Sequence, residues 1–104
     1  MEETKELSEA ISSRFELTIA DNYNLDDLKQ ALFYRIRELL DKNVERLLSI
    51  LYRVDLSQNR LDEIFQNSSK EEIAEKIAEA VIERQLQKIK TREYYKNTES
   101  GLLE

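Results

Sequence analysis

The chain contains no proline, and its single glycine, Gly101, lies among the last four residues. Proline and glycine most strongly interrupt helices and form the tight turns of β-hairpins. Their absence from the rest of the chain therefore favours helices over a sheet. Hydrophobic residues make up 40% and charged residues 37% of the 104 residues, a balance that suits one domain of amphipathic helices.

The N-terminal apolar residues follow the spacing of a helix. They recur at three- and four-residue intervals and predict a short helix over residues 3–15: Leu7, Ala10, Ile11 and Phe15. Apolar and polar residues alternate over residues 15–19, which would fit a strand. A lone strand has nothing to pair with, so we interpret this segment as a helix end or connector. A polar turn over residues 21–24 follows, and Asn24 can cap the next helix.

A continuous apolar stripe runs through the middle of the chain over residues 25–54. The stripe does not break at the polar triplet of residues 41–43, so the pattern predicts one long helix over residues 25–54 rather than two. Asn43 falls inside this stripe. Its amide either finds a local or register-fixing hydrogen bond in the interior, or it is exposed where the helix bends.

Two further helices follow. Ser57 can cap a short helix with three apolar residues on one side: Leu61, Ile64 and Phe65. Ser69 and Glu72 match a capping box and predict a last helix over residues 70–94. The sequence thus predicts an all-α fold, a three- or four-helix bundle in which the long central helix packs against the C-terminal helix. We expect a single helical domain over residues 1–96 and a flexible tail over residues 97–104.

Cysteine and histidine are both missing from the chain. The chain therefore lacks thiolate ligands and the commonest general base, and we expect no metal, no cofactor and no enzyme activity. One alternative is an enzyme that uses carboxylates, with Asp41 or Asp55 acting beside a buried arginine such as Arg53. No apolar run is long enough to span a bilayer, and the acidic N-terminal residues differ from a signal peptide, so we expect a cytoplasmic protein without membrane contact.

An acidic row occupies the start of the last predicted helix, with one member every fourth residue: Glu71, Glu75, Glu79 and Glu83. Such neighbours repel one another unless bases lie close by. Arg35, Arg46 and Arg53 lie along one edge of the middle stripe and could pair with this row inside the chain. The alternatives are a solvated acidic face, another protein, or a divalent cation.

A basic row follows on the same helix and contains Arg84, Lys88 and Arg92, with Tyr94 beside it. One interpretation is that these side chains lie along the edge of the domain, where the C-terminal helix dipole favours bases. The other is a binding site for an acidic protein surface, with Tyr94 as an anchor. Tyr34 and Tyr52 lie opposite the middle stripe and are ordinary surface aromatics, partner contacts, or covered by the N-terminal helix.

Two stretches resemble small bacterial proteins of an uncharacterised all-helical family: LLSILYRVD, residues 47–55, and IERQLQKIKTREYY, residues 82–95. The resemblance covers about residues 25–95. It implies a bacterial, cytoplasmic, helical protein, and no activity or binding residues come with it.

For function, the sequence favours a non-catalytic protein–protein interaction or small regulatory adaptor protein that uses Arg84, Lys88, Arg92 and Tyr94. Self-association as a homodimer is a related hypothesis, because antiparallel last helices would place the acidic row of each copy near the basic row of the other. The alternative is a nucleic-acid-binding accessory protein that uses the basic C-terminal helix, which the net charge of −6 disfavours.

Overall fold

The computed structural model describes residues 2–17 and 24–103, with side chains described for residues 5–17 and 24–92 and for Tyr94. Within this part of the chain all regular structure is helical, as predicted. The helices are α1 (Glu2–Phe15), α2 (Leu25–Lys42), α3 (Val44–Arg53), α4 (Gln58–Asn67) and α5 (Lys70–Leu103). Ile19 of the predicted connector and residues 21–23 of the predicted polar turn lie outside the described residues.

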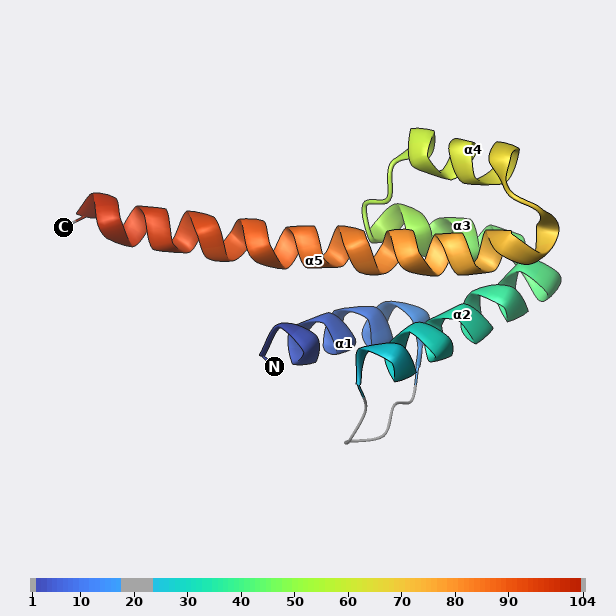
Figure 1. Cartoon of the computed structure of the whole chain (residues 1–104), viewed down its shortest axis with the longest axis horizontal. Helices are drawn as coiled ribbons and strands as arrows, with labels where there is room; N and C mark the ends of the chain where they lie inside the picture. The colour runs from blue at the N-terminus through green and yellow to red at the C-terminus, as the bar shows by residue number, and fades with distance from the viewer. Residues whose placement is uncertain (1, 18–23, 104) are drawn as a thin grey trace.

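The C-terminal helix α5 is the central element of the fold. It packs against α1, α2 and α4, and Figure 1 shows α1 and α2 along one side of it and α4 along the opposite side. Its C-terminal part extends beyond the other helices, and the molecule measures 53 × 33 × 20 Å. The prediction that residues 25–54 form the central helix is therefore wrong.

Asn43 divides the predicted long helix into α2 and α3. Its backbone, at φ −157° and ψ 76°, leaves the helical region, while its N–H still donates to the Leu39 carbonyl at 2.8 Å. Its side-chain oxygen accepts a hydrogen bond from the Arg46 N–H at 3.1 Å and so begins α3. Asn43 is exposed, which agrees with the bend alternative; its hydrogen bonds are local, but the expected place in the interior is wrong. The periodic stripe did not reveal the break because α2 and α3 both turn their apolar sides to the same core.

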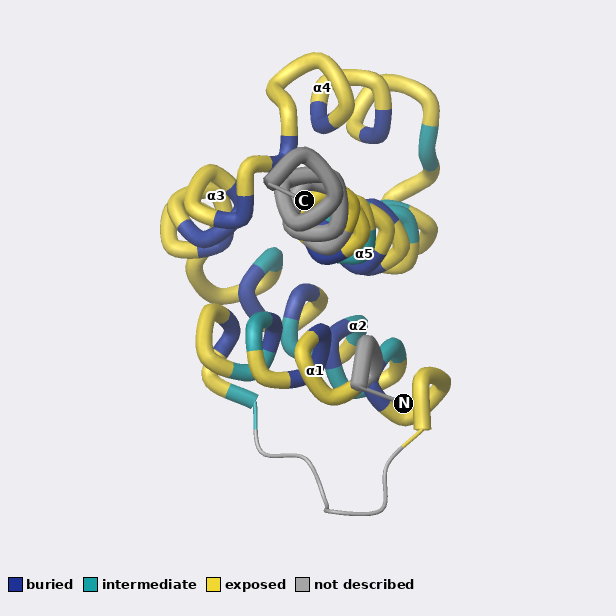
Figure 2. The backbone as a smooth tube through the Cα atoms, turned by 90° about the vertical axis from the view of Figure 1, so that its left-hand side faces the viewer, coloured by how far each residue is buried: buried dark blue, intermediate teal, exposed yellow. Residues whose placement is uncertain are grey.

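The core lies where α1, α2 and α3 meet α5. Most of the predicted stripe is buried, and its fully covered members are Leu28, Leu32, Ile36, Leu47 and Leu51. On α5, Ile77 and Val81 are fully covered as well. Figure 2 shows the buried turns of α4 facing α5, which agrees with the burial of Leu61 and Ile64. Leu25 and Val44, the first residues of α2 and α3, are about half exposed instead.

Two helices end without glycine. Asp55, after α3, has φ 61°, and Glu16, after α1, has φ 57°, a left-handed conformation usually taken by glycine. The Leu56 N–H donates to the Leu51 carbonyl at 3.2 Å, and the Leu17 N–H donates to the Ser12 carbonyl at 3.0 Å. This is the bonding of a Schellman cap. Acidic residues occupy both positions, so no glycine marked these turns in the sequence.

The last helix begins as predicted and ends later. The Ser69 hydroxyl accepts a hydrogen bond from the Glu72 N–H at 3.3 Å, as the capping-box prediction required. The helix then continues past the predicted end at Tyr94 to Leu103, because neither proline nor glycine interrupts it before Gly101. The division into a domain over residues 1–96 and a flexible tail over residues 97–104 stays a prediction.

Candidate functional site

The first two residues of the predicted binding row hold the turn between α3 and α4. The Lys88 ammonium lies 2.7 Å from the Asp55 carboxylate, and the Arg84 Nε donates to the Asp55 carbonyl at 3.2 Å. Between them, the buried Gln85 donates from Nε2 to the Val54 carbonyl at 3.0 Å. The hydrogen bond and charge of Lys88 lower the pKa of Asp55 below its ordinary value of 3.8. Gln85 was missed by sequence reasoning, since a glutamine among apolar helix positions has no motif of its own.

Arg92 and Tyr94 lie farther along α5. The Arg92 guanidinium is 3.9 Å from the Glu6 carboxylate on α1, and 71% of its side chain is exposed. Tyr94 is also exposed. The structure therefore places the four predicted residues along one helix in two groups: Arg84 and Lys88 at the α3–α4 turn, and Arg92 and Tyr94 beyond it.

A groove of about 570 Å³ lies between α1, the end of α3, and α5. We call it the basic groove. Its charged residues are four bases and two acids: Arg14, Arg53, Lys88, Arg92, Glu6 and Glu9. Arg14 also helps to lower the pKa of Asp55, which places its charge near the α3–α4 turn. Residues of three helices that are distant in sequence line the basic groove. The spacing of the basic row on α5 therefore could not predict that Arg14 lies in the same groove.

Two bases of the basic groove have no ion-pair partner among the described residues. Within the described part of the chain, Arg53 forms no ion pair or hydrogen bond, and Arg14 forms no ion pair. The Glu6 contact of Arg92 is long and exposed to solvent at both ends. Such exposed pairs contribute at most about 1 kcal/mol, so Glu6 holds Arg92 only weakly.

The acidic row is engaged partly within the chain. Glu79 accepts a hydrogen bond from the Lys29 ammonium of α2 at 2.9 Å, and Glu83 lies 3.2 Å from the Arg60 guanidinium of α4. The hydrogen bond and charge of Glu79 raise the pKa of Lys29 above 10.5. Intramolecular pairing therefore occurs, but with other bases than those expected.

The arginines expected to pair with the acidic row lie elsewhere. Arg35 donates from Nε to the Phe15 carbonyl at 3.0 Å and pairs with Glu38 on its own helix. Arg46 pairs with Glu16 at the end of α1. Both arginines thus connect α1 to the α2–α3 unit, because α1 covers the side of that unit on which the sequence pattern placed them.

The two tyrosines opposite the core stripe are uncovered. Tyr34 is 64% and Tyr52 is 82% exposed, so their expected coverage by the N-terminal helix is wrong. The ring of Tyr34 lies edge-on to that of Phe33, with centroids 5.4 Å apart. Their exposure fits ordinary surface aromatics as well as partner contacts, and partner contact stays a prediction for both.

The residues of the carboxylate-enzyme alternative lie in different places. Asp41 lies near the end of α2 beside the start of α5, whereas Asp55 follows α3 and is bound by Lys88. Arg53 lines the basic groove and is exposed, so its expected burial is wrong. Among the described residues, no three carboxylates, histidines or cysteines converge as a metal site requires. In the same part of the chain, no helix combines the length and apolarity needed to cross a bilayer.

The geometry defines an all-helical protein with a charged groove along its central helix. Comparisons with protein families, with curated proteins and with solved structures found no match to this chain.

Proposed function

We propose that this chain is a non-catalytic interaction protein that binds a carboxylate-rich segment of another protein in the basic groove. The observation that carries the proposal is the convergence of Arg14, Arg53, Lys88 and Arg92 from three helices, in a chain whose net charge is −6. Bases gathered on one surface of an acidic protein attract an acidic partner by local charge complementarity.

The chemistry of the basic groove suits carboxylates. Lys88 already binds the carboxylate of Asp55, so its charge is balanced within the chain and the carboxylates of a partner would meet the arginines instead. Arginine presents a planar fork of donors that binds carboxylates through two hydrogen bonds. Arg53 and Arg92 supply such forks from α3 and α5, and we expect them to contact the partner directly. Tyr94 lies beyond Arg92 and would extend the contact as an aromatic anchor.

Nucleic-acid binding is the second candidate, favoured by the same bases. Glu6 and Glu9 lie in the basic groove and would repel any anionic ligand, most strongly a phosphate backbone, whose charges recur at every nucleotide. An acidic peptide can instead direct its carboxylates to the bases and leave the two glutamates in solvent. We accordingly favour a protein ligand, in a cytoplasmic setting.

A defined probe tests the proposal. We would titrate a fluorescent oligoglutamate peptide with the protein, follow its anisotropy, and repeat the titration with an RNA oligonucleotide. The test variant combines Arg53→Glu with Arg92→Glu, neither of which holds the α3–α4 turn. The matched control combines Lys42→Glu with Lys90→Glu, two exposed bases outside the basic groove.

Binding of the peptide that is lost in the test variant and kept in the control would support the proposal. No binding by the unmodified chain, or equal losses in both variants, would overturn it. Tighter retention of RNA than of the peptide would favour the nucleic-acid alternative.

A further inference from the structure

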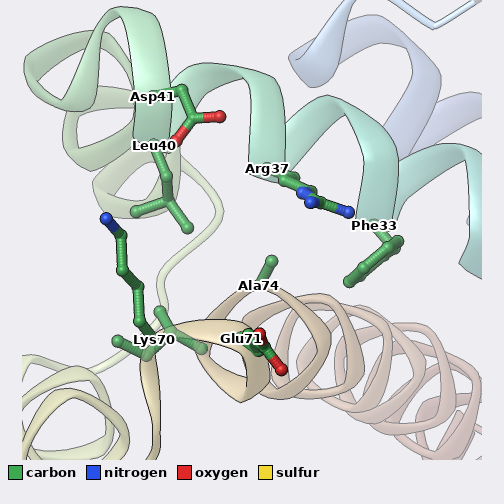
Figure 3. Close-up of a pocket in the computed structure, with 8 residues that line it drawn as sticks. Phe33, Arg37, Leu40, Asp41, Lys70, Glu71 and Ala74 are labelled. Carbon is green, nitrogen blue, oxygen red and sulfur yellow. The ribbon is translucent and has the colours of Figure 1, made fainter.

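A second groove, of about 600 Å³, lies between α2 and the first turns of α5. We call it the α2/α5 groove. Phe33 and Leu40 of α2 and Ile73 and Ala74 of α5 form its apolar lining. Figure 3 shows side chains from the two helices facing the space between them. This groove is separate from the basic groove, which lies where α5 meets α1 and α3.

Four charged side chains surround the α2/α5 groove. Arg37 and Asp41 project from α2, and Lys70 and Glu71 project from α5. In Figure 3, Asp41 and Lys70 lie at the end near Leu40, whereas Arg37 and Glu71 lie farther along. Positive and negative charges therefore alternate both along each helix and across the groove. None of the four forms an ion pair or hydrogen bond within the described part of the chain.

An exposed aromatic ring adjoins this groove. Tyr34 follows Phe33 on α2, and the two rings are in edge-to-face contact with centroids 5.4 Å apart. Phe33 is half-buried as part of the groove lining, whereas 64% of Tyr34 is exposed. The same surface thus carries an apolar hollow and, next to it, an aromatic side chain that projects into solvent. Tyrosine is favoured at the centre of protein interfaces.

We infer that a second copy of this chain covers the α2/α5 groove, with Tyr34 of each copy inserted into the groove of the other. A two-fold axis makes the same surface serve on both copies, so this surface must complement itself. If the axis runs along the groove, Arg37 faces Glu71 of the second copy. If the axis runs across the groove, Arg37 faces Asp41 of the second copy. Opposite charges meet in both cases because the signs alternate.

The inferred contact is compatible with the proposed function and goes beyond it. It uses α2 and the start of α5, so the basic groove stays open to a partner in each copy. The inferred contact also differs from the antiparallel pairing of the last helices that the sequence suggested. That pairing would use the acidic and basic rows, of which Glu79, Glu83 and Lys88 already have partners within the chain.

Sedimentation equilibrium from about 1 μM to about 1 mM protein tests the inference. We expect a reversible dimer whose dissociation constant rises about tenfold or more in Tyr34→Ala. The matched control is Tyr52→Ala, which removes an even more exposed tyrosine from α3 and should leave the dimer unchanged. A protein that stays monomeric over the whole range would overturn the inference. So would a dimer that Arg84→Glu weakens and Tyr34→Ala does not.

Charge exchange then tests the paired surfaces. Arg37→Glu alone should weaken the dimer by creating like-charge contacts. Adding Glu71→Arg restores the dimer if the two-fold axis runs along the groove, and adding Asp41→Arg restores it if the axis runs across. Restoration by either exchange supports the inference, and restoration by neither overturns it. Circular dichroism of each variant confirms that these exposed substitutions leave the helices folded.

Discussion

Lys88 on α5 places its ammonium nitrogen 2.7 Å from the carboxylate of Asp55, the residue that follows α3 in a left-handed conformation. The base thus binds the turn from which α4 departs. Gln85, one helical turn before Lys88, binds the preceding carbonyl of Val54. The central helix therefore holds the α3–α4 turn through side chains of the same stretch that lines the basic groove.

The Asp55–Lys88 contact makes stability depend on pH. Lys88 lowers the pKa of Asp55 in the folded chain, so the unfolded chain takes up a proton first as the pH falls. The stabilisation is fully present above pH 3.8 and is lost as the pH falls through the lowered folded-state pKa. We expect Asp55→Asn to remove this part of the acid dependence of unfolding and Lys88→Met to remove most of it, because Arg84 and Arg14 still lower the pKa of Asp55 in the second variant. Urea unfolding from neutral to acid pH measures this, and an unchanged slope in both variants would contradict it.

Gln85 should contribute to stability through its buried hydrogen bond. Replacing it by methionine, Gln85→Met, keeps most of the volume but leaves the Val54 carbonyl without its donor. The expected cost in the free energy of unfolding is about 1–3 kcal/mol. Gln87→Met, at an exposed position on the same helix, is the control and should change stability little. Equal urea midpoints for the two variants would refute this role of Gln85.

Asn43 should stabilise the break between α2 and α3. Asn43→Ala removes the side-chain oxygen that accepts the Arg46 N–H and should cost about 1 kcal/mol, as measured by urea unfolding. Asn43→Asp keeps an accepting oxygen and should retain most of the stability. An alanine variant more stable than the natural chain would instead favour the continuous helix over residues 25–54, because alanine is the best helix former.

Glu16 should carry a conformational cost at the end of α1. Its φ of 57° is easy for glycine and unfavourable for a residue with a Cβ atom. Both Glu16→Gly and Glu16→Ala remove the ion pair with Arg46. The difference between their free energies of unfolding therefore measures the cost of the backbone conformation alone. We expect the glycine variant to be more stable by roughly 1 kcal/mol in thermal or urea unfolding. Equal stability would show that the left-handed turn costs nothing here.

Local sequence signals predicted the helical fold and most helix starts. Asn24, Ser57 and Ser69 cap α2, α4 and α5, since a cap depends on residues only a few positions apart. The apolar spacing also identified the core face. The break at Asn43 was missed, because two helices that share one core continue the same periodicity across a bend.

The candidate site was predictable only in part. The basic row on α5 was visible because its members are four residues apart on one helix. The acids and bases that α1 and α3 add to the groove depend on how distant segments pack, so Arg14 and Glu9 gave no sequence signal. The contact of Arg84 and Lys88 with the α3–α4 turn likewise depends on the path of the chain after α3.

Binding of carboxylates in the basic groove is the central claim, and an NMR titration of the labelled protein with the oligoglutamate peptide tests it most directly. We predict saturable shifts of amide signals on the three sides of the groove, including those of Arg14, Arg53 and Arg92, and their loss in the variant with Arg53→Glu and Arg92→Glu. Absence of shifts there, or shifts confined to Arg37 and Lys70 at the α2/α5 groove, would contradict the claim.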